Sequence, residues 1–215
     1  MPTQPLEVRT ATEAEFAAIA ELTATTYLTE GYGDTSYEST LRDVAGRARA
    51  ATVLVAVIGG EVVGAVAVAT KGGAYAEMAA PGEAVIRMLV VGPAARGSGA
   101  GTALVQGCLD AALADGCEVV RLSTQATMTA AHRIYERVGF IRTPERDWQL
   151  VRPVRRTRRP PGVSAGQRAR TAAVLPALSA ADGRAGNPDR LDRALRGARP
   201  DTGLTADLPR AVTAK

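Results

Sequence analysis

Histidine, cysteine and aromatic residues are all scarce in this sequence. The scarcity of cysteines limits disulfide and metal sites, and the scarcity of aromatics limits what can form the core. Among its 215 residues there are one histidine and two cysteines, Cys108 and Cys117, and aromatic residues make up 4%. Two cysteines without CxxC spacing provide neither a disulfide framework nor a paired metal motif, so we predict buried, reduced thiols and no metal site. With so few aromatic side chains, the core must consist mainly of valine, leucine, isoleucine and alanine.

Long apolar runs are also missing. Of the two most apolar stretches, residues 53–58 end at Gly59-Gly60 and residues 62–69 contain Gly64. Both fall far short of the ~18–20 residues of a membrane-spanning helix. The N-terminal sequence has no basic start followed by an apolar run, which predicts no secretory signal. We therefore expect a soluble, cytoplasmic protein without a membrane partner.

Charge is distributed unevenly along the chain. Residues 1–148 carry 12 Lys/Arg and 17 Asp/Glu, whereas residues 149–215 carry 14 Lys/Arg and 5 Asp/Glu, so the net charge of +4 comes from the C-terminal segment. That segment has no aromatic residue and opens with a basic, proline-broken run at residues 155–161. Its composition predicts a disordered, Arg/Pro-rich tail after a folded domain at residues 3–148, with residues 150–154 as the candidate for a short last strand. A replaced or out-of-frame C-terminus stays open as an alternative, because the change in composition is abrupt.

Hydrophobic periodicity predicts alternating strands and helices before the tail. Alternating or β-branched segments indicate strands, and apolar residues at helical spacing indicate helices. The expected strands are residues 6–9, 53–58, 61–69, 84–91, 119–124 and a last one from Phe140; the expected helices are one from Thr12 to near Gly31, one carrying Leu41, Val44 and Ala48, and two at residues 101–114 and 129–138. Antiparallel neighbours come first and strand–helix crossovers follow, which predicts a mixed α/β sheet rather than a doubly wound parallel one.

A glycine-rich turn joins the strand that ends near Val91 to the helix that follows it. The turn contains Arg96, Gly97, Gly99 and Gly101, and glycines allow successive backbone N–H groups to point at one place. The helix N-terminus adds its dipole, so the turn predicts a site for an anion such as a pyrophosphate. The segment contains neither GxxxxGKS/T nor GxGxxG, which excludes a P-loop and a dinucleotide fingerprint. It fits the pattern Arg-x-x-Gly-x-Gly instead.

A second motif turns this pattern into a family resemblance. Residues 130–140 form a helical segment that contains Tyr135 and ends at Gly139-Phe140, about 35 residues after the turn and with a strand between. With both motifs in this order, residues 3–148 resemble the GNAT-type (GCN5-related) N-acetyltransferases. The resemblance implies an acyl-CoA N-acyltransferase fold, in which helices flank a mostly antiparallel central sheet with a splayed strand pair. It also implies transfer of an acetyl group from acetyl-CoA, the cosubstrate, to a primary amine of a small molecule or peptide, by direct attack in a ternary complex.

The same resemblance implies roles for residues of both motifs. Acetyl-CoA would bind the backbone of Leu89, Val90 and Val91 with its pantetheine arm, and its pyrophosphate would bind the turn formed by Arg96, Gly97, Ser98, Gly99, Ala100, Gly101 and Thr102. Backbone N–H groups of the splayed strand would stabilise the oxyanion. Tyr135 would be the catalytic acid that protonates the leaving thiolate. A phenol of pKa ~10 facing a thiol of pKa ~8.5 makes this proton transfer uphill by roughly 2 kcal/mol, which a positioned acid tolerates.

Two positions depart from the pattern of that family. Met128 stands where relatives often have an asparagine that bonds the cofactor, and Val85 stands where they often have an acidic residue that helps to deprotonate the amine. The general base is therefore unassigned. Glu83, Glu77, Glu30 and a water chain are the candidates, although each of these carboxylates is also explained as a solvated loop charge.

Other interpretations stay open beside the enzyme. His132, the sole histidine, is interpreted as a surface residue rather than a catalytic one. Residues 27–37 and 71–83 are expected to line the acceptor pocket; their acidic residues would favour a cationic amine, although solvated charge explains them equally well. A catalytically impaired acyl-CoA-binding protein is a second interpretation. A nucleic-acid-binding role for the basic tail is disfavoured because the tail lacks aromatic residues for base stacking, and a homodimer is left open.

Overall fold

The computed structural model describes residues 4–144, 148–149 and 168–174. Its strands are β1 (Leu6–Thr10), β2 (Thr52–Ile58), β3 (Glu61–Ala69), β4 (Glu83–Val91), β5 (Val119–Gln125), β6 (Ile141–Arg142), β7 (Trp148–Gln149) and β8 (Arg168–Val174). Its α-helices are α1 (Phe16–Thr29), α2 (Glu38–Arg42), α3 (Val44–Ala50), α4 (Ala100–Ala114) and α5 (Thr129–Val138), with 3-10 turns at Glu13–Glu15, Thr35–Tyr37 and Pro93–Ala95. None of the helices within these ranges is long and apolar enough to cross a membrane.

A single mixed sheet forms the centre of the molecule. The strand order is β1-β2-β3-β4-β5-β8-β6, and β7 pairs with β8. The β4–β5 pair is parallel and the other pairs run antiparallel. The α/β fold class and the mostly antiparallel character of the sheet are confirmed. Gly59 and Gly60 make the hairpin turn between β2 and β3, with φ of +61° and +83° that glycine adopts at low cost.

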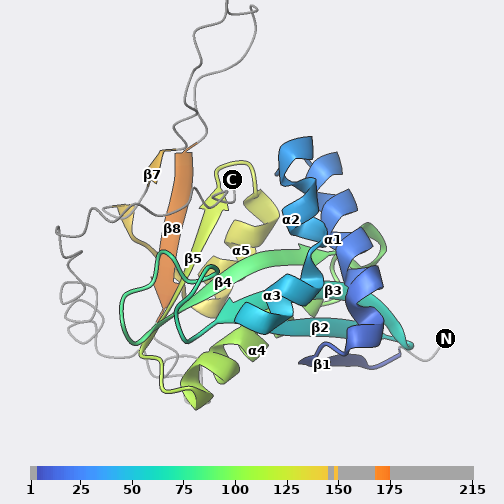
Figure 1. Cartoon of the computed structure of the whole chain (residues 1–215), viewed down its shortest axis with the longest axis horizontal. Helices are drawn as coiled ribbons and strands as arrows, with labels where there is room; N and C mark the ends of the chain where they lie inside the picture. The colour runs from blue at the N-terminus through green and yellow to red at the C-terminus, as the bar shows by residue number, and fades with distance from the viewer. Residues whose placement is uncertain (1–3, 145–147, 150–167, 175–215) are drawn as a thin grey trace, which may run out of the picture.

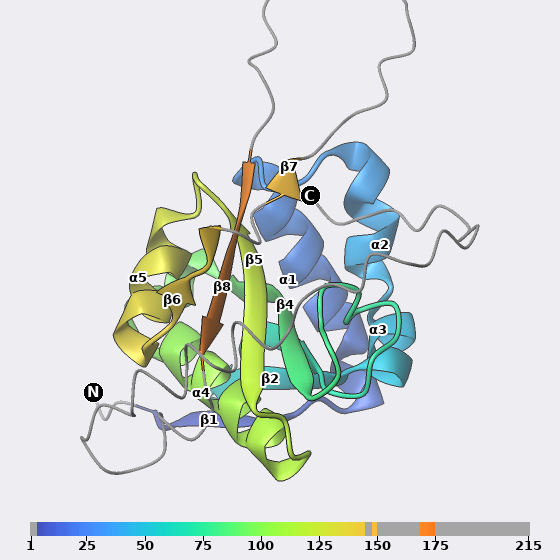
Figure 2. The same ribbon diagram turned by 90° about the vertical axis from the view of Figure 1, so that its left-hand side faces the viewer.

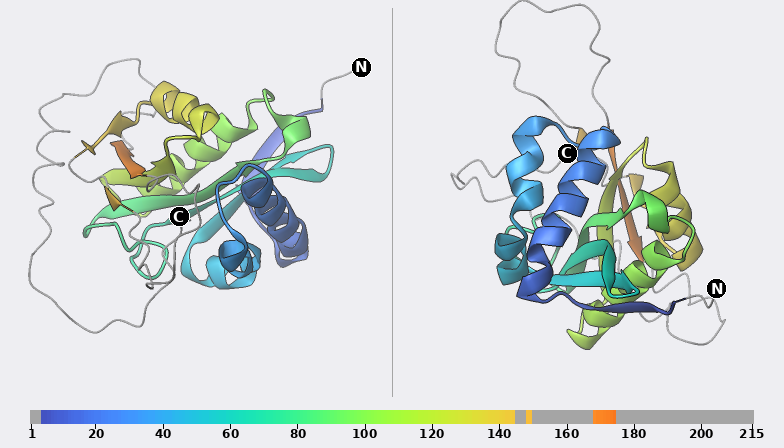
Figure 3. Two further views of the ribbon diagram at one scale, coloured as in Figure 1. Left: turned by 90° about the horizontal axis from the view of Figure 1, so that it is seen from above. Right: turned by 90° about the vertical axis from the view of Figure 1, so that its right-hand side faces the viewer.

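Helices cover both faces of the sheet (Figures 1 and 3). On one face α4 and α5 pack against side chains such as Leu54 and Ile86, with Leu104 of α4 fully buried. On the other face α1, α2 and α3 pack against side chains such as Val55, with Ile19 of α1 fully buried. The core is aliphatic, as the composition predicts, and both cysteines are free and buried within it or at its edge.

The region predicted as one helix around Leu41 and Val44 is two helices. Leu41 and Val44 are buried as expected, but the backbone breaks between them at Asp43, where φ is −78° and ψ is +68°. The Asp43 carboxylate accepts a hydrogen bond of 2.8 Å from the Gly46 N–H, which caps α3. Ala48, expected on the buried face, is exposed, and Arg47 is buried beside it. A capping aspartate inside an apolar pattern restarts the helix and rotates its buried face.

Part of the predicted disordered tail is a strand. β8 pairs antiparallel with β5, from Val120↔Val174 to Gln125↔Ala169, and lies beside it in Figure 2. For residues 168–174 the expectation of disorder is therefore wrong. The physical reason is non-local: β5 has a free edge opposite β4, and any short segment of small and β-branched residues can satisfy its backbone groups. The candidate last strand at residues 150–154 and the rest of the tail lie outside the described residues, and the domain boundary at residue 148 stays a prediction.

Candidate active site

The two central strands separate at their carboxyl ends. β4 and β5 pair in parallel from Glu83↔Val119 to Ile86↔Leu122 and no further, although β4 continues to Val91 and β5 to Gln125. Backbone groups of residues 87–91 on this edge therefore have no partner in the β4–β5 ladder. The splayed pair expected from the resemblance is present, and it opens a gap in the middle of the sheet where backbone donors can reach a ligand.

A bulge in β4 lies at the start of this gap. Met88 has a φ of +54°, the left-handed region that a side chain rarely adopts. The register with β3 shifts at this point: Ala65 pairs with Val90 and Ala67 pairs with Arg87, so β4 contains one extra residue. A left-handed non-glycine residue costs roughly 1–2 kcal/mol. The rest of the sheet offsets that cost, and the bulge turns the β4 backbone where the two strands part.

The glycines of the turn before α4 have two different structural reasons. Gly97 and Gly99 have φ of +83° and +89°, with open space where a Cβ would lie, so their backbone conformation is what requires glycine. Gly101 is helical, but a Cβ there would lie 2.7 Å from the Cδ1 atom of Ile134 in α5. Its missing side chain lets α5 approach α4. The turn thus places the N-terminus of α4, with its N–H groups and dipole, beside the gap.

A cavity of about 620 Å³ connects the turn, the gap and α5. Nine of the ten predicted cofactor-binding residues line it: Leu89, Val90, Val91, Arg96, Gly97, Gly99, Ala100, Gly101 and Thr102. Ser98 is not among the lining residues; its hydroxyl accepts a hydrogen bond of 3.3 Å from the Ala100 N–H and so supports the turn from within. The structure brings these residues together, and their contacts with a cofactor stay predictions.

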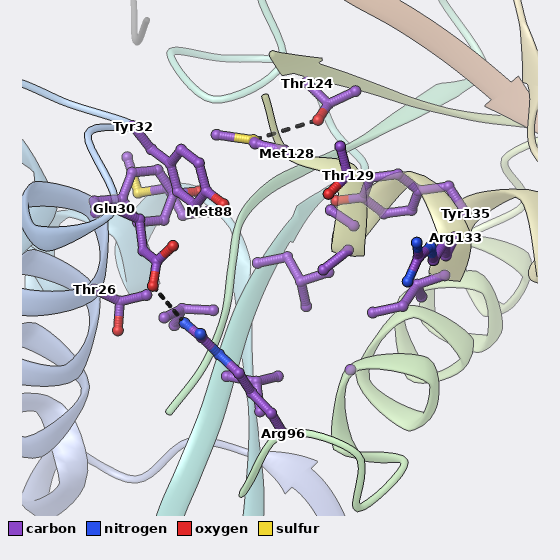
Figure 4. Close-up of a pocket in the computed structure, with 18 of the residues that line it drawn as sticks. Thr26, Glu30, Tyr32, Met88, Arg96, Thr124, Met128, Thr129, Arg133 and Tyr135 are labelled. Atoms are coloured by element: carbon purple, nitrogen blue, oxygen red, sulfur yellow. Dashed lines mark hydrogen bonds and ion pairs between the residues drawn. The ribbon is translucent and has the colours of Figure 1, made fainter. Parts of the chain in front are cut away.

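Arg96 forms an ion pair across the cavity. Its Nη2 lies 2.8 Å from Oε1 of Glu30, at the end of α1, and both residues line the cavity. Figure 4 shows Arg96 extending from the turn toward Glu30. The two side chains are 52% and 34% exposed, so the pair is solvated and its net stabilisation is small, on the order of 0–1 kcal/mol. Arg96 is therefore able to change partners when an anion occupies the turn.

Tyr135 lies in the wall of the same cavity, on α5. It is 8% exposed, and its ring packs against Phe140, with centroids 5.5 Å apart and planes tilted by 55°. Figure 4 shows the ring pointing from α5 toward Thr129. Burial raises the pKa of Tyr135 above its ordinary value, so the phenol keeps its proton across the physiological range. Such a group can donate a proton, and it cannot act as a base.

The candidate bases from sequence are all engaged by arginines. Glu83, interpreted as a solvated loop charge, is 5% exposed and makes a two-point contact with the fully buried Arg121, so that interpretation is wrong. Glu83 opens β4 at the paired end, away from the gap. Glu77 lies 3.9 Å from Arg87, and Glu30 pairs with Arg96. Among the lining residues that the structure describes, Glu30 is the one carboxylate.

The two departures from the family pattern and the sole histidine also have defined surroundings. Met128 lines the cavity, and its Sδ accepts a hydrogen bond of 3.3 Å from the Thr124 hydroxyl (Figure 4). Val85 is fully buried in a small apolar cluster with Ala69 and Ala76, so no acid stands at that point of β4. His132 is half-buried and is not among the lining residues, so it lies outside the cavity wall.

Six residues form a second half of the cavity, which we call the acceptor half: Tyr27, Tyr32, Tyr37, Arg87, Met88 and Gln125. Tyr27 and Tyr32 pack edge to face, with ring centroids 6.0 Å apart. Burial raises the pKa of Tyr27 to about 12. The sequence indicated residues 27–37 and 71–83 as pocket lining. The first range is represented in the cavity wall, but none of residues 71–83 lines it, so that part of the expectation is wrong. The sequence gave no signal for Arg87, which lies inside a predicted strand, or for Gln125, which directly follows one.

The comparison with family models shows which family the chain belongs to. Residues 16–140 match the model of the Acetyltransferase (GNAT) family. No curated protein matches the chain in sequence. Among solved structures, a putative acetyltransferase from Salmonella typhimurium, yncA, described with its cofactor acetyl-CoA, is 22% identical with a TM-score of 0.58, covering 83% of this chain and 99% of that one. A ribosomal-protein-alanine N-acetyltransferase from Brucella melitensis is 20% identical with a TM-score of 0.57, covering 79% and 99%. These two likenesses concern the fold.

Proposed function

Because the chain belongs to the GNAT acetyltransferase family, we propose that it transfers the acetyl group of acetyl-CoA to a primary amine of a small molecule or peptide by direct attack in a ternary complex. Family and fold support acetyl transfer in general. We propose in addition that the acceptor is an amine, that it attacks the thioester directly, and that the residues below have the roles described.

One observation carries it: a single cavity contains a helix N-terminal glycine turn, a parted strand edge and a buried phenol. The turn offers N–H groups and a dipole to a diphosphate. The parted edge of β4, from Arg87 to Val91, offers backbone partners to an extended, amide-containing arm, much as an added strand would find them. Tyr135 then lies where such an arm would end. The order of these three features matches the order of the diphosphate, the pantetheine arm and the thioester along acetyl-CoA.

The chemistry follows from this order of groups. The amine nitrogen attacks the thioester carbonyl, and the oxyanion that forms would be stabilised by backbone N–H groups near the β4 bulge at Met88. When the intermediate collapses, the C–S bond breaks and the thiolate takes a proton from the Tyr135 hydroxyl. The attacking nitrogen loses a proton, the tyrosinate recovers one from solvent, and the products are an amide and free coenzyme A.

Burial affects both partners of the proton transfer in the same direction. It raises the pKa of the Tyr135 phenol, and it equally disfavours a thiolate released into the same desolvated space. Burial of the thiolate therefore offsets part of the rise in the pKa of the donor. Tyr135 remains a competent acid although it is a weaker one in absolute terms.

No side chain is assigned as the base. Glu30 lines the cavity but bonds Arg96 at 2.8 Å, and Glu83 bonds the buried Arg121. We propose that the acceptor enters as the free amine or loses its proton to water in the open part of the cavity. Turnover should then rise with pH until the acceptor amine is unprotonated.

The direct test is thiol release from acetyl-CoA by the purified full chain, measured against a panel of amines and short peptides. Titration calorimetry with acetyl-CoA gives binding separately. Acetyl-CoA-dependent thiol release with matching N-acetylated product supports the proposal. Binding without turnover for any amine would instead favour the catalytically impaired acyl-CoA-binding protein, and no binding at millimolar acetyl-CoA would overturn both.

A further inference from the structure

The acceptor half of the cavity contains one arginine, Arg87, which comes from strand β4 of the central sheet. Arg87 belongs to β4 and lies just beyond the last β4–β5 pair, Ile86↔Leu122. The register Val85↔Arg121 places Arg87 on the same face as Ser123 and Gln125, two other lining residues. Its side chain is 13% exposed. The arginine side chain is a cation, so the acceptor half has a positive centre.

The contacts of Arg87 leave most of its donors unused among the residues that the structure describes. Nε donates to the Tyr75 carbonyl oxygen over a long 3.3 Å, and Nη2 lies 3.9 Å from Oε2 of Glu77, beyond hydrogen-bond range. A guanidinium presents five N–H donors in a planar fork that matches a carboxylate. Glu77 is 39% exposed and makes only a long ion pair with Nη2. A carboxylate on a bound ligand could contact the rest with better geometry.

The charges in the cavity favour the same conclusion. Glu30 is its one carboxylate among the described lining residues, and it is held by Arg96. Arg96 lies in the turn, and the remaining lining arginines, Arg133 and Arg137, lie on α5. These three arginines belong to the turn and to α5, and the turn is where the phosphates of acetyl-CoA are proposed to bind. The acidic residues of the loops therefore do not favour a purely cationic acceptor, because those in the cavity wall or beside it are already paired.

A buried amide in the acceptor half has an unused acceptor atom. The Gln125 side chain is 3% exposed, and its Nε2 donates to the Tyr32 carbonyl oxygen over 2.9 Å, which fixes the orientation of the amide. Its Oε1 is buried and makes no hydrogen bond within the part of the chain that the structure describes. Leaving such a buried acceptor unpaired is unfavourable. An N–H group of a bound ligand would relieve that cost.

We infer that the acceptor is an α-amino acid with an apolar side chain: Arg87 binds its carboxylate, Gln125 Oε1 accepts a hydrogen bond from its amine, and the tyrosine wall of Tyr27, Tyr32 and Tyr37 holds its side chain. This inference rests on the proposed function and narrows its substrate class. An α-amine is separated from its carboxylate by one carbon. Because Arg87 is adjacent in sequence to the Met88 bulge, a carboxylate on Arg87 places the amine beside the proposed position of the thioester.

The test compares three forms of each acceptor with the full chain at saturating acetyl-CoA: L-leucine, L-methionine and L-phenylalanine, their carboxamides, and the corresponding decarboxylated amines. We expect kcat/KM to be at least about 10-fold higher for the amino acids, since one charge-assisted contact is worth that much or more. Arg87→Gln should lower kcat/KM for amino acids by about 10- to 100-fold, mainly through KM, and change the carboxamides less than about 3-fold. Arg87→Lys keeps the charge without the fork and should fall between.

A merely structural role of Arg87 gives a different pattern. If Arg87 only anchors the loop through Tyr75, Arg87→Gln lowers kcat for amino acids and carboxamides by the same factor, and that result overturns the inference. Equal turnover of amino acids, carboxamides and amines by wild type overturns it as well. A failure to release thiol with every amine overturns the proposed function itself, and is recognised because the carboxamides fail too.

A binding measurement keeps the inference testable if turnover is slow or the variant is unstable. In the presence of coenzyme A, N-acetyl-leucine should raise the melting temperature of the wild type and N-acetyl-leucinamide should not. The same shift from both products contradicts the inference.

Discussion

Arg96 of the turn before α4 donates a hydrogen bond of 2.8 Å to Glu30 at the end of α1, so one ion pair joins two sides of the cavity (Figure 4). Arg96 belongs to the motif that is proposed to bind the pyrophosphate. Without acetyl-CoA, its guanidinium is held by a carboxylate of the protein. Binding of the diphosphate would replace that partner, and Glu30 therefore competes with the cosubstrate for Arg96.

Glu30→Gln tests this competition. Removing the carboxylate should lower the KM for acetyl-CoA by roughly 2- to 5-fold, because a half-exposed pair contributes about 0.2–1 kcal/mol. The effect should shrink as salt is added. Glu38→Gln is the matched control, since Glu38 pairs with Arg42 on the outside of α2. A higher KM in Glu30→Gln would mean that Glu30 supports the site rather than competing for Arg96.

Gly99 provides a test of the turn itself. Gly99 and Gly116 both have left-handed φ, +89° and +77°, and both have open space at the Cβ position. Alanine at either site should cost roughly 1–2 kcal/mol of backbone strain and lower the melting temperature by several degrees. Gly99 lines the cavity and Gly116 does not. Because a shift of the Gly99 backbone misaligns the amides at the start of α4, Gly99→Ala alone should weaken acetyl-CoA binding, by about 5-fold or more.

The paired design separates strain from binding. Calorimetric Kd values for acetyl-CoA and melting temperatures of both variants are the required measurements. Equal losses of affinity in Gly99→Ala and Gly116→Ala would show that the turn amides do not bind the cosubstrate.

Tyr135→Phe tests the general acid. The ring packs against Phe140, so phenylalanine should preserve packing while removing the proton donor. We expect kcat to fall by about 10²-fold or more with little change in KM, the range for loss of a general acid. Since burial raises the pKa of Tyr135, the tyrosine is protonated at both pH 7 and pH 9, and the ratio of wild-type to variant kcat should be the same at both.

Tyr75→Phe is the comparison for Tyr135→Phe. The Tyr75 ring lies in the β3–β4 loop and is not among the cavity-lining residues, so loss of its hydroxyl should leave kcat unchanged. Turnover of Tyr135→Phe at the wild-type rate would remove the acid role, and a ratio that changes with pH would show that the residue ionises in this range.

Sequence patterns predicted local features well and non-local ones poorly. The predicted helix start at Thr12 is one success: the Glu15 carboxylate accepts a hydrogen bond of 2.8 Å from the Thr12 N–H, and α1 follows at Phe16. β8 and the break at Asp43 were missed. β8 exists because β5, far away in sequence, offers an open edge, and the helix break depends on one aspartate that can either extend a helix or cap the next.

The site shows the same division. The turn and α5 have spacing rules, so Arg96, the glycines and Tyr135 could be named from sequence. Arg87 and Gln125 could not, since their positions depend on where two strands part and on which face each residue lies, and that register arises from pairing of distant segments. The left-handed Met88 is equally invisible, because the conformation contradicts its own local preference.

Glu83 and Arg121 form a buried ion pair that decides between a structural and a catalytic role for Glu83. They are 5% and 0% exposed and join the N-terminal halves of β4 and β5, so the pair fixes the strands just before they separate. Glu83→Gln leaves a buried guanidinium without its counter-charge and should destabilise the fold by about 3–5 kcal/mol, and Arg121→Met should do the same. The double variant Glu83→Gln/Arg121→Met should lose less stability than the sum of the two single variants, because it removes both charges together.

Urea unfolding of the single and double variants measures this coupling, with Glu38→Gln as the exposed comparison that should change stability by less than about 1 kcal/mol. At a temperature where Glu83→Gln remains folded, its kcat should stay within about 3-fold of wild type, since the carboxylate is engaged by Arg121 at the paired end of the strands and does not line the cavity. A stable Glu83→Gln protein whose kcat has fallen by orders of magnitude would reverse this assignment. In that case Glu83 itself would be the general base for the acceptor amine.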